Sequence, residues 1–193
     1  MSSNHRNRVV TLVATAVSFI FVTFLIVGTS RAAFSDTTAN DNNTVGSAGV
    51  VLTDDDSGSA MFTVADMSPD DTIVRCIEVT YDGTITTNDP IQLYRTAAPT
   101  GTGLEAYLDM TVEIGTGGGS AACTGFTPSS TLTSGSLAAF FSTHTAYASA
   151  LSTAWTPTGA GQKRTFRFTL TMQDDNAAQA KNTTFGYTWE ARA

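Results

Sequence analysis

The sequence predicts an all-β protein: an antiparallel two-sheet sandwich of the jelly-roll kind with one short helix, behind an N-terminal hydrophobic signal helix. Apolar and polar residues alternate in nearly every strand-like stretch, which is the pattern of sheets with one buried face and one face in water. Glycine, proline, aspartate and asparagine bound these stretches. Connections of about ten residues or more between strands favour a jelly roll over simple hairpins.

The first 33 residues predict an export signal. Residues 9–27 form an uncharged apolar run, and basic residues precede it at His5, Arg6 and Arg8. Small residues follow the run, and this order is that of a secretory signal peptide. The run is also close to the roughly 20 residues that a membrane-spanning helix needs, so a retained N-terminal anchor is the alternative.

The expected cleavage region comprises Ser30, Ala32 and Ala33. Cleavage after Ala32 puts small residues at both specificity positions of the signal peptidase, whereas cleavage after Ala33 puts Arg31 at one of them. We therefore expect cleavage after Ala32 or close to it. Residues 1–33 are then the signal peptide, and residues 34–193 form a single β-sandwich domain.

The composition suits a secreted acidic protein. Without residues 1–32, which hold three arginines and no acid, seven basic residues stand against 17 acidic ones, a net charge of −10. Such a charge argues against nucleic acid as a partner, because phosphate binding relies on lysine and arginine. In an oxidising compartment the only two cysteines, Cys76 and Cys123, most simply form a disulfide; two buried free thiols are the alternative.

The first half of the domain begins without a clear element. Residues 34–49 are small and polar and predict no firm structure. Strands are predicted at 45–52 and 59–65, with a turn at 54–58 between them. The three consecutive aspartates of this turn lack the alternating spacing and the closing glutamate of a calcium loop, so a solvated turn is favoured over a metal site.

Three further strands are predicted at 72–81, 91–96 and 104–114. The last of these alternates over its full length and is the clearest strand of the chain. Cys76 lies on the face opposite to the apolar residues of its strand. The glycine-rich stretch at 115–120 lacks the lysine and the helix of a phosphate-binding loop, so it predicts a flexible connection.

The apolar period becomes helical at 137–151, which predicts the one helix. His144 lies on its apolar face, where a core histidine with one hydrogen-bond partner is favoured over a catalytic or metal role. Alternation returns at 164–172, and the last strand is predicted at 183–192.

No stretch supports an enzyme. His144 is the only histidine outside the signal region, so a nucleophilic triad has no free base and a zinc peptidase has no ligand set. The aspartate pairs at 54–56, 70–71 and 174–175 lie in turns, where solvated acids are the rule. We therefore expect no catalytic, metal-binding or cofactor-binding residues.

The leader is followed at once by Phe34, Ser35, Asp36 and Thr37. Further short motifs lie at 45–49, 67–71, 179–181 and 185–191. In these motifs the chain resembles the TasA/camelysin-like family of secreted proteins over most of its mature length. The leader together with Phe34–Thr37 is the most specific of them.

This resemblance implies a jelly-roll sandwich that assembles into extracellular fibres of a biofilm matrix, each subunit donating its N-terminal strand to a neighbour. Residues 34–45 would be the donor strand. An open sheet edge accepts such a strand because its backbone groups are unpaired. The implied partners are further copies of the chain or a related matrix protein, and a signal peptidase; the membrane is contacted only through the N-terminal segment before cleavage.

The chain departs from the family pattern in its two cysteines and its low lysine content, which leaves assembly open. Some camelysin relatives are labelled metallopeptidases, but the ligand residues are missing here. The alternative function is a monomeric surface-displayed module that binds carbohydrate or protein through Tyr94, Tyr107 and Trp155. A secreted hydrolase would need carboxylates or metal ligands that only the fold brings together.

Overall fold

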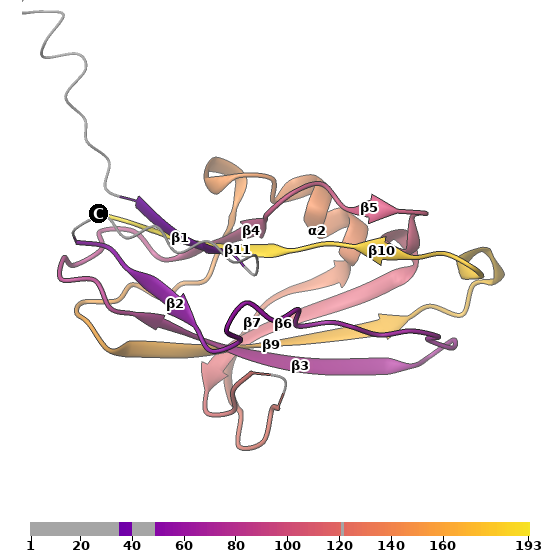
Figure 1. The fold of residues 1–193 in the computed structure, drawn as a ribbon, viewed down its shortest axis with the longest axis horizontal. Coiled ribbons are helices and arrows are strands. Elements are labelled where there is room, and N and C mark those ends of the chain that lie inside the picture. The colour runs from indigo at the N-terminus through magenta and orange to yellow at the C-terminus, as the bar shows by residue number, and fades with distance from the viewer. Residues whose placement is uncertain (1–34, 40–48, 121) are drawn as a thin grey trace, which may run out of the picture. The chain divides into compact units, whose positions relative to one another are not determined.

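The computed structural model describes residues 35–39, 49–120 and 122–193, and the structural statements below concern these residues. They belong to one compact unit that begins at Phe34. The unit is built mainly of antiparallel strands in two large sheets, with one short α-helix (Figure 1). The predicted all-β, antiparallel class is therefore confirmed.

The first sheet has four strands in the order β1-β11-β4-β8. Their bounds are Ser35–Ala39 for β1, Tyr187–Arg192 for β11, Gln92–Arg95 for β4 and Leu151–Ser152 for β8. A two-stranded ribbon of β5 (Thr100–Gly101) and β10 (Thr183–Thr184) continues from β4 and β11 toward the other end of the molecule (Figure 1).

The second sheet has five strands in the order β2-β3-β9-β6-β7. Their bounds are Leu52–Asp54 for β2, Thr72–Tyr81 for β3, Gln162–Met172 for β9, Leu108–Thr116 for β6 and Thr127–Ser136 for β7. Short 3-10 helices lie at Leu104–Tyr107, Tyr147–Ser149 and Asn176–Ala178.

A cluster of aromatic rings joins the two sheets into one core. Phe166 and Phe168 of β9 pack against Trp189 and Tyr187 of β11, with ring centroids 5.5 and 4.6 Å apart. All four side chains are almost fully buried. These rings fill the interior between the two sheets. On β11 the alternating residues Thr188 and Glu190 are also buried, at 5% and 4% exposed, so this strand is covered on both faces.

The helix α2 spans Leu137–Thr143 and is shorter than the predicted 137–151. Ser136 caps its start by accepting a hydrogen bond from the amide of Ala139. Beyond its end, the hydroxyl of Ser149 accepts hydrogen bonds from the amides of Thr145 and Ala146. These side-chain bonds compete with the helical pattern, so the chain leaves the helix at His144.

Three other parts of the pattern differ from the structure. Residues 59–65 form no strand, and most of them are exposed. Strand β7, which the alternation did not reveal, holds one apolar residue, Leu132, and lies exposed at the edge of its sheet. The clear strand predicted at 104–114 begins only at Leu108, because a 3-10 turn precedes it.

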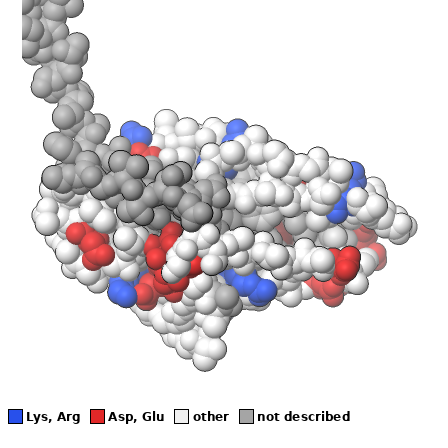
Figure 2. Space-filling view, in the orientation of Figure 1, with Lys and Arg blue, Asp and Glu red and all other residues white. Residues whose placement is uncertain are grey.

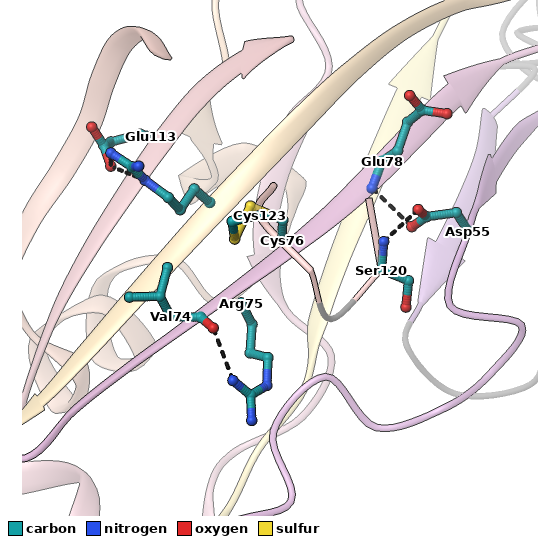
Figure 3. Close-up of a disulfide and its surroundings, with 9 residues drawn as sticks. Asp55, Val74, Arg75, Cys76, Glu78, Glu113, Ser120 and Cys123 are labelled. Atoms are coloured by element: carbon teal, nitrogen blue, oxygen red, sulfur yellow. Dashed lines mark hydrogen bonds and ion pairs between the residues drawn. A yellow bond between two sulfur atoms is a disulfide. The ribbon is translucent and has the colours of Figure 1, made fainter. Parts of the chain in front are cut away.

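Cys76 and Cys123 form a disulfide that ties the connection between β6 and β7 to β3 (Figure 3). The carboxylate of Asp55 supports the same connection from the side. It accepts hydrogen bonds from the amide of Glu78 in β3 at 2.9 Å and from the amide of Ser120 at 2.6 Å. The connection is therefore held to the sheet by a covalent and a hydrogen-bonded contact.

Replacing both cysteines by alanine is expected to lower the free energy of unfolding by roughly 2–5 kcal/mol, because the bridge closes a loop of 47 residues in the unfolded chain. Urea unfolding of the wild-type and double-alanine proteins measures the difference. The alanine substitutions also change the packing of the Cys76 side chain, which is fully buried. Reduced wild-type protein is the control for this effect, because it keeps both cysteine side chains and lacks only the bridge. A change below about 1 kcal/mol would contradict the entropic account.

Candidate functional site

The N-terminal strand β1 lies at the edge of the four-stranded sheet and pairs only with β11. The pairing is antiparallel over five residues, from Ser35 opposite Arg192 to Ala39 opposite Thr188. The sequence of β1 contains no large apolar residue. The strand is therefore held mainly by backbone hydrogen bonds, and it adds little apolar surface of its own.

Beyond β1, residues 183–187 continue the same edge, and we call them the open rim. The carbonyls of Asn182 and Gly186 accept hydrogen bonds from Thr102 and Thr96, on the side of β4 and β5. Alternate residues of a strand point their backbone groups to opposite sides, so Thr183, Phe185 and Tyr187 point theirs to the side of β1. No strand pairs with them there among the residues that the structure describes.

A second unpaired backbone runs beside the open rim. Residues 60–67 make no backbone hydrogen bond within the described parts of the chain. Between this segment and the rim lies a cavity of about 200 Å³, which we call the aromatic pocket. It is lined by Ala60, Met61, Phe62, Thr183, Thr184, Phe185 and Tyr187.

A larger cavity of about 630 Å³ adjoins the aromatic pocket at Thr183, which lines both. Its walls come mainly from residues within 64–69 and 172–183, together with Leu104. The hydroxyl oxygen of Thr183 is buried and has no hydrogen-bond partner in the described structure. A buried polar atom without a partner is uncommon in folded proteins, so a group from outside would be favourable here.

The other sheet edges carry features that discourage pairing. Strand β8 has only two residues and β2 only three, and the acidic Asp55 follows β2 directly. Strand β7 is longer, but it contains Pro128 and its pairing with β6 has two register shifts. Short strands, charges, proline and bulges are the usual means of blocking an edge. The edge formed by β1 and the open rim is the least protected of those described.

A buried polar network flanks β1 on β11. Glu190 is only 4% exposed and shares a rung with Thr37 of β1. It accepts hydrogen bonds from the hydroxyl of Tyr94 at 2.5 Å and from Nε of Arg192 at 2.7 Å. Burial and the neighbouring carboxylate raise the pKa of Tyr94, so it stays protonated and keeps donating. The network fixes the outer surface of β11 next to β1.

The residues expected for strand donation fall into two groups. Ser35, Asp36 and Thr37 lie in β1. They are paired with β11 of their own chain, so the prediction of no firm structure for this segment was wrong for residues 35–39. The expected cleavage residues Ser30, Ala32 and Ala33, as well as Phe34 and residues 40–45, lie outside the described residues.

The aromatic platform of the alternative function does not form. Trp155 is only 5% exposed, the hydroxyl of Tyr94 is bonded to Glu190, and Tyr107 lies under the amino group of Lys181. These three side chains were proposed as an exposed binding surface, and the burial of Trp155 rules out that arrangement.

His144 lies at the C-terminal end of α2 and is half-buried rather than in the core. Its Nδ1 forms a hydrogen bond with the carbonyl of Ser149 at 2.8 Å.

Among the described residues, no three histidine, cysteine, aspartate or glutamate side chains are grouped to hold a metal ion. On the face shown in Figure 2, basic side chains are scattered and form no continuous stripe. No helix in the described ranges is long and apolar enough to cross a membrane.

The acidic turn contains one unusual carboxyl group. Asp56 is only 6% exposed and accepts a hydrogen bond from the amide of Gly58 at 2.7 Å. Burial, followed by a hydrogen bond with Asp54 and the charges of Asp54 and Asp55, raises its pKa from 3.8 to about 6. The folded chain therefore binds a proton at Asp56 more readily than the unfolded chain does.

Replacing Asp56 by asparagine is expected to stabilise the protein above pH 6. The raised pKa means that ionised Asp56 destabilises the fold at high pH, and that this penalty disappears as the pH falls from about 6 toward 3.8. Thermal unfolding at pH 8 and at pH 4 measures the difference. The asparagine variant should melt higher at pH 8 and converge with the wild type at pH 4. The exposed Asp89→Asn is the control, and an equal gain there would contradict the assignment.

Comparison of the sequence with models of known protein families and with curated proteins found no match.

Proposed function

We propose that the protein is a secreted structural subunit of extracellular fibres or of a biofilm matrix, and that it assembles by donating its N-terminal strand to a neighbouring copy. The observation that carries the proposal is the position of β1: a polar edge strand paired with β11, next to the open rim of residues 183–187. The jelly-roll connectivity and the N-terminal signal helix belong to this proposal as well.

Exchange of β1 between copies conserves its interactions. When β1 leaves, the backbone groups of β11 that faced it become unpaired, and the same strand of a second copy can restore them. The exchange therefore changes the number of hydrogen bonds very little, and concentration decides its direction. Because each copy donates at one place and accepts at another, the contact is head-to-tail and grows a filament.

The second part of the support is the distribution of protected edges. A subunit that paired through every edge would aggregate without order, whereas one unprotected edge gives a single direction of growth. The short strands β2 and β8 and the interrupted strand β7 leave the β1 side as the accessible one among the described strands. The disulfide would suit the oxidising conditions outside the cell.

Electron microscopy of the purified mature chain tests the proposal. We expect filaments whose amount increases with protein concentration. Deleting residues 34–44 should abolish them, while circular dichroism still shows a folded β protein. N-terminal sequencing of the secreted protein would locate the cleavage site. A mature protein that stays monomeric at high concentration would contradict the proposal and favour a monomeric binding module.

A further inference from the structure

The start of β10 contains an acceptor motif for N-linked glycans. Asn182 is followed by Thr183 and Thr184. An asparagine with serine or threonine two positions later, and no proline between them, is the motif to which oligosaccharides are attached in exported proteins. Serine and threonine are common in this chain, so the motif alone has little weight. Its weight depends on how the fold presents the asparagine.

The fold places this motif at the surface. Of the three asparagines in the described parts of the chain, Asn88, Asn176 and Asn182, only Asn182 begins such a motif. Asn182 and Thr184, the two residues that define the motif, are both exposed. They lie on the ribbon of β5 and β10, at the end of the molecule away from β1 (Figure 1). A second motif begins at Asn42, outside the described residues.

The side chain of Asn182 is held through its oxygen. Its Oδ1 accepts a hydrogen bond from the amide of Thr102 at 3.2 Å, and its own backbone amide donates to the hydroxyl of Thr102 at 2.7 Å. A Cβ atom at position 101 would lie 2.5 Å from Oδ1, so Gly101 leaves room for this contact. Because a backbone amide only donates, the bonded atom is the oxygen, and Nδ2 points to the other side. Nδ2, the atom that a sugar would be joined to, has no hydrogen-bond partner among the described residues.

Space for the attached sugars lies beside the motif. Asn182 borders the larger cavity of about 630 Å³, a volume within the roughly 300–1,000 Å³ of small-ligand sites. The polar side chains of Asn176, Gln179 and Lys181 also line this cavity. Amide and ammonium groups form hydrogen bonds with hydroxyls. The first sugars would therefore find both room and polar partners next to the point of attachment.

We propose that Asn182 carries an N-linked glycan in the exported protein. The inference rests on the export that belongs to the proposed function, and it adds a covalent modification. In the reaction, Nδ2 of Asn182 forms a bond to the anomeric carbon of a lipid-linked oligosaccharide, and the bond between that carbon and the lipid phosphate breaks. The lipid phosphate leaves, and one amide proton passes to a base of the transferase. The bulky polar glycan then covers the end formed by β5 and β10 and leaves the edge at β1 free.

Mass spectrometry of the protein secreted by its natural producing cells tests the attachment. The tryptic peptide that ends at Arg192 contains the motif at Asn182 and not the one at Asn42. This peptide should carry the mass of an oligosaccharide. Enzymatic hydrolysis of the bond between sugar and asparagine should then leave aspartate at position 182. Secreted protein with an unmodified Asn182 would overturn the inference.

Two neighbouring threonines provide a matched pair of variants. Thr184→Ala removes the hydroxyl that the motif requires, so the modification at Asn182 should be lost completely. Thr183→Ala keeps the motif, and the hydroxyl that it removes has no hydrogen-bond partner in the described structure, so the modification should be unchanged. Thr184→Ser also keeps the motif and should restore the modification. Equal loss in the two alanine variants would contradict recognition through the motif.

The location of the chain separates the failure of this inference from that of the proposed function. An exported chain that forms filaments without a glycan at Asn182 would refute the modification and leave the fibre subunit standing. An exported, glycosylated chain that forms no filaments would do the reverse. A chain that stays inside the cell, unmodified, would refute export, and both proposals with it.

Discussion

An engineered disulfide between Ala39 and Thr188 is expected to stop filament growth completely, because it prevents β1 from leaving its own sheet. The two residues are direct partners at the end of the β1–β11 ladder. The backbone of Thr188 points toward β4, so the pair is not hydrogen-bonded, and its Cα atoms should lie about 4.5 Å apart. That separation is within the range in which a disulfide forms without strain.

Electron microscopy of the double-cysteine variant, oxidised and then reduced, measures the effect. Filaments should be absent from the oxidised sample and return after mild reduction. The single variant Ala39→Cys and the wild-type protein in the same reductant control for loss of the native bridge, whose Cys76 is fully buried. Normal filaments from the oxidised double variant would show that assembly does not require release of β1.

The parts of the fold that the sequence predicted well are those with a strict alternation between core and solvent. Strand β3 was predicted with its observed bounds, and β9 was placed to within two residues. In both, buried residues such as Val79 and Phe168 alternate with half-buried ones. Alternation reports burial on one face, so it is a reliable sign wherever a strand contributes to the core.

The misplaced elements are those whose structure does not depend on burial. Strand β7 is an exposed edge strand stabilised by its pairing with β6, and its serines and threonines give no alternating signal. Residues 59–65 have strand-like composition, but the register of β2 with β3 ends before them and no partner strand follows. Pairing between distant segments is not encoded in a local pattern.

The candidate site was only partly predictable for the same reason. The leading segment stood out by its polar composition and by its position after the expected leader, but its pairing with β11 joins residues at opposite ends of the domain, such as Ser35 and Arg192. The aromatic pocket brings residues 60–62 next to residues 183–187. Neither part indicates a cavity by its own sequence, so only the fold shows that the two segments line the same one.

Replacing Trp189 by alanine is expected to lower the free energy of unfolding by about 3–5 kcal/mol, the usual range for a large buried aromatic residue. Its side chain is fully buried, and its ring lies 5.5 Å from that of Phe166 and 6.1 Å from that of Phe168. Its indole nitrogen has no hydrogen-bond partner in the described structure. The loss is therefore one of packing, and Trp189→Phe, which keeps a ring, should cost clearly less.

The same substitution tests whether strand docking depends on the core. Trp189 shares a rung with Thr38, so β11 carries both the core and the ladder that holds β1. If core packing around Trp189 holds β11 in the conformation that pairs with β1, Trp189→Ala should reduce filament growth even at temperatures where the variant is folded. Phe166→Ala is the matched control, because it opens a similar cavity in β9, which does not pair with β1. Urea unfolding gives the folded fraction of each variant, and filament yield is then compared at equal folded fraction. Equal losses of filament growth in both variants would mean that stability alone controls growth. A larger loss for Trp189→Ala would show that growth depends on the packing of β11 itself.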